Sequence, residues 1–184
     1  MPLLESFLIK LPNALVGEIG LDNVATDPTT KKKYRMDRQI DAFIKQMNLA
    51  TRYNRPVSVH LVKCHGQFLD IMKAIQYDSI PKKIMLHSWT GSAEIAMELL
   101  KIPVVGPRLY FSLSHGVSAR SPQFGRRIEN LPIDRLLVES DVHDTLEVDN
   151  AIEKIVELIA GVRGMPLDDI VDVLVRNTES FSDM

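Results

Sequence analysis

Five short apolar runs, each followed by an amphipathic stretch, constrain the fold of this chain more than any other feature. The runs occupy residues 15–21, 56–62, 83–89, 108–114 and 135–141. Short apolar runs bounded by polar segments predict buried strands, and apolar residues at helical spacing between them predict helices. Strands that alternate with helices form parallel sheets with right-handed crossovers. The pattern therefore predicts an α/β fold, either a doubly wound sheet or part of a barrel.

The expected helices lie between and after these runs. Ser92 is a suitable N-cap for one of them, because its hydroxyl can accept a backbone N–H of the first turn. Gly164 fits a helix C-cap, and Pro166 stands where the last helix would begin. We expect helices over residues 37–53, 66–77, 92–100, 122–129, 148–162 and 167–181.

Composition narrows the class of protein. The chain has 184 residues, 45% of them hydrophobic, and a formal net charge of −2. These values predict one folded domain over residues 1–184 and argue against binding to nucleic acid through bulk charge alone.

A single cysteine, Cys64, excludes a disulfide framework and fits a reducing compartment, which predicts an intracellular protein of the cytoplasm or nucleus. No apolar run approaches the ~18–20 residues that span a bilayer, so we expect no membrane partner.

Four of the five predicted strands carry a potential metal ligand at or near their carboxyl end. These residues are Glu18, His60, His87 and Asp141. One such residue in an apolar run is most simply a satisfied polar group of the core. Four at equivalent places favour a shared site, because the carboxyl ends of parallel strands meet at one edge of the sheet. Carboxylate and imidazole groups form the ligand set that zinc, manganese or magnesium hydrolases use.

Several segments resemble one known family in order and approximate spacing. Residues 17–22 resemble the Gly-Glu-x-Gly-Leu-Asp signature of the TatD-related deoxyribonucleases, which are metal-dependent hydrolases on a TIM (β/α)8 barrel. Residues 39–50 are similar to the family's Gln-x-x-x-Phe-x-x-Gln-x-x-x-Ala helix, and residues 56–60 to its Pro-Val-x-x-His strand. Residues 86–91 resemble its His-Cys-Phe-Thr/Ser-Gly segment, and residues 131–141 its Ile-Pro-x-x-Arg-Leu-Leu-Leu-Glu-Thr-Asp segment.

The resemblance implies a role for each of the four strand-end residues. In complete relatives, the residue that matches Glu18 bridges two divalent metal ions, and those that match His60 and His87 hold one of them. The residue that matches Asp141 holds the other ion and is placed to accept a proton from the attacking water. The implied catalytic residues are therefore Asp141 and Glu18, the implied reaction is two-metal hydrolysis of DNA phosphodiester bonds, and the implied ions are Zn, Mg or Mn.

The sequence also departs from the family pattern. The family's first strand carries a His-x-His pair that binds a metal, and no His-x-His occurs here. By this alignment the first three βα units are absent, which predicts an incomplete barrel made of roughly strands four to eight with C-terminal helices. We therefore expect one partial domain at residues 1–184, with one well-formed metal site from Glu18, His60 and His87. The residues that follow His87 and Asp141 resemble a eukaryotic, fungal-type branch.

Other residues are candidates for substrate binding, each with a plainer alternative. Lys33 lies in a basic run over residues 31–35 that could contact DNA phosphates or simply be a solvated loop. Trp89 could stack on a base or belong to the core. His115 and His143 follow strands at the same predicted end, where they could face the site.

The sequence leaves three functions open. The first is a TatD-type hydrolase with DNA as its substrate. The second is a catalytically impaired scaffold with a protein partner, which the missing His-x-His favours. The third is hydrolysis of an amide or lactone, since metal barrels support several reactions. The oligomeric state is left open.

Overall fold

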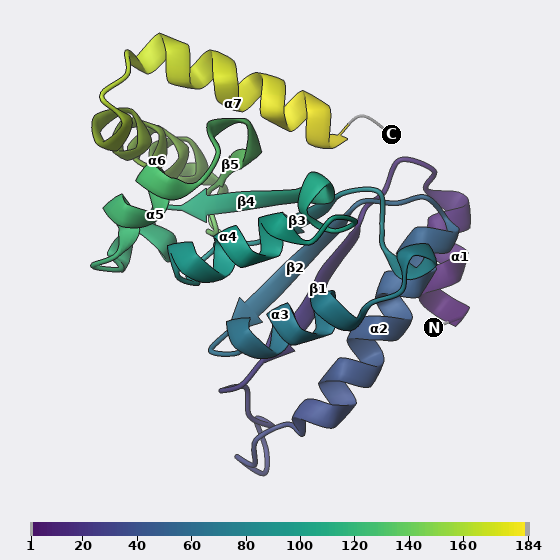
Figure 1. The fold of residues 1–184 in the computed structure, drawn as a ribbon. Coiled ribbons are helices and arrows are strands. Elements are labelled where there is room, and N and C mark those ends of the chain that lie inside the picture. The colour runs from purple at the N-terminus through teal and green to yellow at the C-terminus, as the bar shows by residue number, and fades with distance from the viewer. Residues whose placement is uncertain (1, 183–184) are drawn as a thin grey trace.

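The computed structural model describes residues 2–182, which form one parallel sheet with helices around it (Figure 1). The strands are β1 (Val16–Asp22), β2 (Val57–Val62), β3 (Ile84–Leu86), β4 (Leu109–Ser114) and β5 (Leu136–Glu139). The helices are α1 (Pro2–Lys10), α2 (Met36–Arg52), α3 (His65–Ala74), α4 (Ala93–Lys101), α5 (Phe124–Asn130), α6 (Val148–Arg163) and α7 (Leu167–Ser182).

The sheet follows the order of the chain. Neighbouring strands pair in the order β1-β2-β3-β4-β5, and each of the four pairs is parallel. Within residues 2–182, β1 and β5 are the two edges of the sheet. The expected α/β fold with five parallel strands is therefore confirmed, and helices connect the strands as crossovers require.

The helices agree with the pattern except at the N-terminus. Helix α1 is not among the helices that the pattern predicts, and its apolar residues Leu3, Phe7 and Ile9 are exposed. Ser92 caps α4 by accepting the Ile95 N–H at 3.2 Å, and Gly164 ends α6 at φ 61°, both as predicted. No helix within residues 2–182 is both long enough and apolar enough to cross a membrane.

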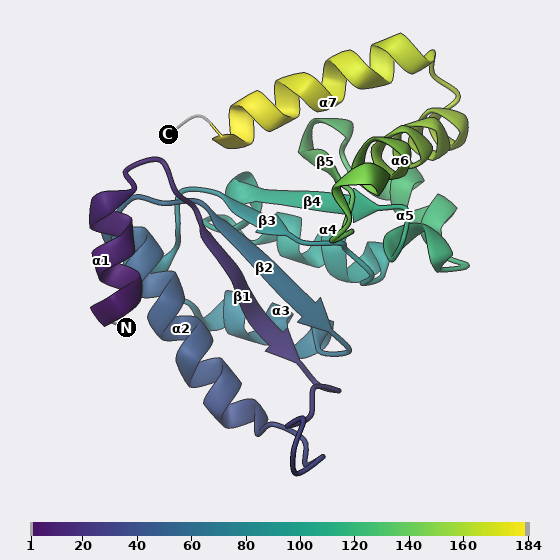
Figure 2. The ribbon, with the colours of Figure 1, turned by 180° about the vertical axis from the view of Figure 1, so that it is seen from behind.

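The two faces of the sheet differ in chemistry. Alternate strand residues such as Val59, Leu86 and Phe111 are buried in the main core with residues of the helices. The side chains between them point to the opposite face, because side chains alternate along a strand. The sheet is seen from that side in Figure 2, with β1 and β2 in front. This face carries the polar residues Ser58, His60, Ser112, Ser114 and Glu139, and beside them an apolar cluster of Met85, Tyr110 and Leu137 that packs against Phe181 of α7. The polar part of this face is where a functional site can form.

Gly20 lets β1 and β2 approach closely beside that polar face. Its φ is +153°, and a Cβ atom built on it would lie 1.9 Å from the carbonyl oxygen of His60. Only glycine tolerates both the conformation and the contact. The second glycine of the 17–22 motif thus fixes the spacing between the strands that carry Glu18 and His60.

Candidate active site

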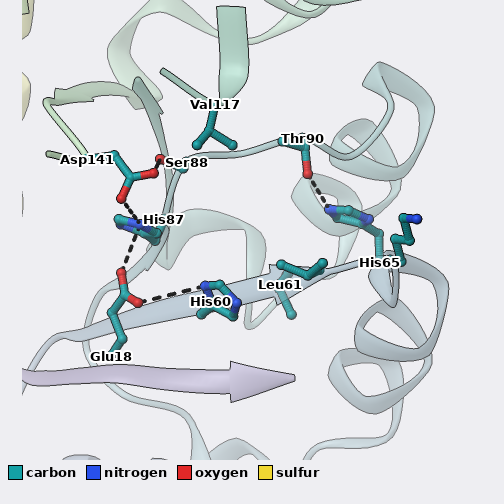
Figure 3. A pocket seen from close by; sticks show the side chains of 11 residues that line it. Glu18, His60, Leu61, His65, His87, Ser88, Thr90, Val117 and Asp141 are labelled. Carbon is teal, nitrogen blue, oxygen red and sulfur yellow. Dashed lines mark hydrogen bonds and ion pairs between the residues drawn. The ribbon is translucent and has the colours of Figure 1, made fainter. Parts of the chain in front are cut away.

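The four sequence-predicted ligands lie together at the polar face. Glu18 projects from β1, His60 from β2, His87 directly follows β3, and Asp141 lies two residues past β5. His87 keeps its place because the ladder continues beyond β3, with its N–H donating to the Val59 carbonyl at 2.9 Å. Figure 3 shows all four side chains lining one pocket of about 510 Å³. The fold therefore brings together residues that are up to 123 positions apart in the chain, Glu18 and Asp141.

His87 is at the centre of the contacts among these side chains. Its Nε2 atom lies 2.9 Å from Oε1 of Glu18 and 3.3 Å from Oδ1 of Asp141. The other carboxylate oxygen of Glu18 is 3.7 Å from Nδ1 of His60 (Figure 3). Both imidazoles are thus held by carboxylates, and Glu18 contacts both of them.

Glu139 is a member of the site that is not among the residues predicted from the sequence. Its Oε2 atom lies 2.7 Å from Nδ1 of His87, and its Oε1 atom accepts the Ser88 N–H at 2.5 Å and the Ser88 hydroxyl at 2.8 Å. The Ser88 hydroxyl also lies 3.2 Å from Oδ2 of Asp141. Glu139 therefore orients His87 and, through Ser88, connects it to Asp141. Its signal in the sequence is that it matches the Glu of the family segment that residues 131–141 resemble, two residues before Asp141.

The charges around His87 change how it titrates. Burial alone lowers the pKa of His87, but its hydrogen bond to Glu139 and the charges of Glu139, Glu18 and Asp141 raise that pKa to about 9. Burial raises the pKa of Glu139, yet the bonds from His87 and Ser88 outweigh it and leave the pKa below its ordinary value. At neutral pH the two residues form a charged pair, which favours the arrangement described above.

A further acidic residue, Asp22, lies near the ring nitrogen of His60 that does not face Glu18. Its Oδ2 atom is 3.6 Å from Nε2 of His60, while its Oδ1 atom accepts the N–H groups of Val24 and Ala25 at 2.7 and 2.9 Å. Gln39 of α2 holds the Asp22 backbone with two hydrogen bonds, one from the Asp22 N–H at 2.7 Å and one to its carbonyl at 3.0 Å. Both Asp22 and Gln39 belong to segments that match the family motifs, but the motifs alone did not reveal this contact.

Three residues that line the pocket adopt unusual backbone conformations. Ser88 has φ 40°, Lys63 has φ 50° and Asp141 has φ 52°, all in the left-handed region. Non-glycine residues enter that region at a cost, and they do so mostly where surrounding contacts hold them at functional sites. Each turn redirects the chain at the end of a strand, which places His87 and Asp141 over the pocket.

The donor set has the chemistry of a divalent metal site, but the side chains are not arranged as one. Two carboxylates and two imidazoles suit zinc, manganese or magnesium. Within residues 2–182, however, no group of three or more His, Cys, Asp or Glu side chains is placed so that it could hold an ion. His87 instead bonds to carboxylates through both ring nitrogens, and a protonated imidazole offers no lone pair to a metal. The well-formed three-ligand site expected from the sequence is thus not preformed.

The other wall of the pocket is organised by a buried arginine. Arg127 of α5 is 2% exposed, and its guanidinium donates to the carbonyls of Gly91 at 2.6 Å and Thr90 at 3.0 Å. Thr90 in turn contacts Nε2 of His65 at 3.4 Å (Figure 3). Burial lowers the pKa of His65, and the nearby charge of Arg127 lowers it further. This wall is therefore rigid, with a neutral imidazole facing the pocket at physiological pH.

The four residues expected to bind substrate do not line this pocket. Trp89 is 1% exposed and packs edge-on against Phe111 and His65, at ring separations of 5.3 and 4.9 Å. It belongs to the core, which is one of the two alternatives that the sequence left open, and it has no free face on which a base could stack. His115 follows β4 and His143 follows β5, but neither is among the pocket residues, and Lys33 lines a separate hollow.

Fold and site together define a class: an α/β protein whose acidic and imidazole side chains converge at the carboxyl ends of parallel strands. A family profile described as TatD related DNase matches residues 3–183, nearly the whole chain. The chain therefore belongs to the TatD related DNase family. The resemblance drawn from its motifs is confirmed at the level of the family.

Similar curated proteins share about a quarter to a third of their residues with this chain. Cut9-interacting protein scn1 of Schizosaccharomyces pombe is 27% identical, with 95% of this chain and 64% of that protein covered. An uncharacterized deoxyribonuclease of Saccharomyces cerevisiae is 33% identical, with 70% and 45% covered. Human deoxyribonuclease TATDN3 is 26% identical, with 96% and 62% covered. The chain thus spans less than two thirds of the length of each of these relatives.

Solved structures share the fold. The crystal structure of the TatD homologue YjjV of Escherichia coli superposes with a TM-score of 0.77 at 24% identity, covering 98% of this chain and 69% of that one. A TatD family hydrolase of Entamoeba histolytica gives 0.74 at 17% identity, with 96% and 66% covered. The five-stranded parallel sheet therefore matches the fold of TatD-type barrels.

Proposed function

We propose that this chain provides the active site of a metal-dependent hydrolase that cleaves phosphodiester bonds in DNA. The observation that supports this most strongly is the convergence of Glu18, His60, His87 and Asp141 on one pocket of a TatD family fold. Relatives that carry the names deoxyribonuclease and metal-dependent hydrolase support the same reaction class. They favour the hydrolase over the catalytically impaired scaffold.

Each residue has a proposed role in this reaction. Glu18, His60, His87 and Asp141 would hold the divalent ion or ions, which would supply charge neutralisation at the phosphoryl group and a lower pKa for water. Asp141, which is partly exposed and lines the pocket, would accept a proton from the attacking water. Glu139 fixes the ring of His87, so that its Nε2 atom faces Glu18 and Asp141. The ordered wall at Thr90 and His65 bounds the space for the substrate.

We also propose that β1 to β5 correspond to the last five strands of an eight-stranded barrel, with residues 1–184 as one partial domain. The order of the motifs supports this, as does the share of each relative that the chain covers. Complete relatives would use two divalent ions, and the likeness to scn1 supports a fungal-type branch. The intact mass of the native protein, detected through its C-terminal segment, tests the proposal. A species well above 20.8 kDa supports the partial domain, and a species of 20.8 kDa contradicts it.

For location and partners, we propose an intracellular protein of the cytoplasm or nucleus with DNA as its main partner. The single buried thiol of Cys64 is consistent with a reducing compartment. Fractionation of source cells with the same C-terminal antibody tests this. Recovery in the secreted fraction would contradict it.

The decisive experiment for the function is the substitution Asp141→Asn. It keeps the size of the side chain but removes the carboxylate that would bind metal and accept a proton. Hydrolysis of a labelled DNA oligonucleotide with added Mn²⁺ should fall by at least about 100-fold. Asp149→Asn in the exposed first turn of α6 serves as the matched control and should leave the rate unchanged. Full activity in the Asp141 variant would refute the assignment.

A further inference from the structure

The candidate pocket is too acidic to attract a polynucleotide through its own charges. It is lined by Glu18 and Asp141, with Glu139 and Asp22 directly behind its histidines. Lys63 is the one lysine or arginine among the pocket residues in the described part of the chain. A strand with a negative charge at each phosphate must therefore be held by cations elsewhere on the surface.

The loop over residues 23–35 supplies such cations on an ordered frame. It leaves the carboxyl end of β1 and enters α2, at the foot of the molecule in Figure 1. Thr26 and Lys33 form an antiparallel bridge, and the Asp27 N–H donates to the Lys32 carbonyl at 2.9 Å. The Asp27 carboxylate accepts the N–H groups of Thr29 and Thr30 at 3.0 and 2.6 Å. These bonds fix the backbone, so the lysines project from a defined hairpin.

A second hollow, of about 530 Å³, lies between this loop and α2. Its basic lining residues are Lys32, Lys33, Arg35 and Arg38. Arg35 pairs with Asp37 at 2.5 Å, whereas Lys32 and Lys33 form no ion pair within residues 2–182. Asp27 also lines the hollow, so four basic residues stand against two carboxylates, those of Asp27 and Asp37, and the hollow keeps a net positive charge.

Tyr34 places an aromatic ring among these cations. Its side chain is 50% exposed, it lines the same hollow, and its N–H donates to the Ala25 carbonyl at 3.1 Å. An exposed ring beside lysine and arginine is the combination that single-stranded nucleic acid uses, because bases stack on the ring while phosphates meet the cations. A simple polyanion would need the cations alone.

The hollow is connected to the candidate active site by a short chain of contacts. Gln39 lines the hollow and makes both of its amide hydrogen bonds to the backbone of Asp22. The Asp22 carboxylate is 3.6 Å from His60, which lines the active-site pocket. Asp22 thus lies between the hollow and the active-site pocket, and these contacts place the two sites near each other.

We propose that this basic hollow, formed by Lys32, Lys33, Tyr34 and Arg38, binds a single nucleic-acid strand beside the active site. The cations contact backbone phosphates, and Tyr34 stacks on one base. The proposal rests on the proposed function, because it specifies the substrate as a polynucleotide strand rather than a small phosphodiester. It also gives Lys33 a role in a site distinct from the catalytic pocket.

The first test removes the charges. Lys32, Lys33 and Arg38 are replaced together by Ala, and the control replaces three exposed cations of α1, α6 and α7, Lys10, Lys154 and Arg176. Binding of the full chain to a fluorescent single strand of about 20 nucleotides is measured by anisotropy in EDTA across a series of salt concentrations. The plot of log K against log salt has a negative slope, and loss of three phosphate contacts should reduce the magnitude of that slope by about 2. The control should keep the wild-type slope.

The second test separates a nucleic acid from other polyanions. Tyr34→Ala should weaken binding of the oligonucleotide at least about fivefold, and Tyr34→Phe should restore it. Neither variant should change the binding of inorganic polyphosphate, which has no base to stack. Equal weakening for polyphosphate would overturn the proposal of a nucleic-acid strand.

The binding tests are independent of catalysis. Hydrolysis of a small chromogenic phosphodiester by the wild type tests the proposed function separately from the binding of a strand. If the wild type hydrolyses no phosphodiester but its binding of the strand still depends on the loop, this inference stands and the proposed function fails. If loop and control variants bind the strand equally, the inference fails whatever the activity.

Discussion

The Nδ1 atom of His87 lies 2.7 Å from Oε2 of Glu139, and this contact turns the other ring nitrogen of His87 toward Glu18 and Asp141. A carboxylate behind a histidine fixes the tautomer and raises the basicity of a ligand. We therefore expect Glu139→Gln to weaken binding of Mn²⁺ by about 10- to 100-fold without unfolding the protein. Isothermal titration calorimetry measures the affinity. Glu153→Gln, on the exposed side of α6, is the control, and equal affinities in the two variants would contradict this role.

Gly20→Ala should destabilise the protein strongly. Its Cβ would lie 1.9 Å from the His60 carbonyl, so β1 must move away from β2. We expect the free energy of unfolding to fall by about 3 kcal/mol or more. Gly161→Ala in α6 meets no atom within 4 Å and should instead stabilise the helix by up to about 1 kcal/mol. Urea unfolding compares the two, and similar effects at both positions would argue against the close approach.

Arg127→Ala should cost far more than the same change at its neighbour. Arg127 is buried, and its loss leaves the carbonyls of Gly91 and Thr90 without a donor. We expect a loss of about 3–5 kcal/mol, against less than about 1 kcal/mol for Arg126, whose pair with Glu94 is exposed. Thermal unfolding of both variants measures the difference. A small effect at Arg127 would show that the pocket wall does not depend on it.

The thiol of Cys64 should react slowly in the folded protein. Burial raises its pKa to about 11, and its Sγ atom donates to the Leu21 carbonyl at 3.1 Å. Since the thiolate is the nucleophile, alkylation by iodoacetamide at pH 8 should be at least about 100-fold slower than in urea.

The same pKa shift has a consequence for stability. The folded protein holds the proton more tightly than the unfolded chain does. The stability associated with Cys64 should be complete below pH 9 and should decline as the pH rises toward 11. Equal alkylation rates in the folded and unfolded protein would contradict the burial.

The sequence predicts the sheet and the convergence of four side chains well, because both follow from local periodicity and from the rule that parallel strands end at one edge. It does not predict how those side chains contact each other. Glu139 and Asp22 act through tertiary contacts with His87 and His60 that no spacing encodes. The position of Trp89 depends on packing against Phe111, which a strand-end position does not reveal.

The basic run at residues 31–35 is a second case in which the sequence shows the residue types but not their contacts. Its charge is visible in the sequence, but the hairpin that orders Lys32 and Lys33 forms through backbone bonds to Asp27 and Ala25. The contact of Gln39 with Asp22, which places the hollow beside the site, joins residues 17 positions apart. Such contacts require the folded backbone.

The most direct test of a metal-dependent site is the binding of Mn²⁺ by the full chain, followed by electron paramagnetic resonance, in the wild type and in Glu18→Gln. Glu18 contacts both histidines of the proposed site. We expect that the wild type binds Mn²⁺ and that the substitution lowers the affinity at least about tenfold. Undiminished Mn²⁺ binding in the Glu18 variant, or none in the wild type, would contradict a metal-dependent site at this pocket.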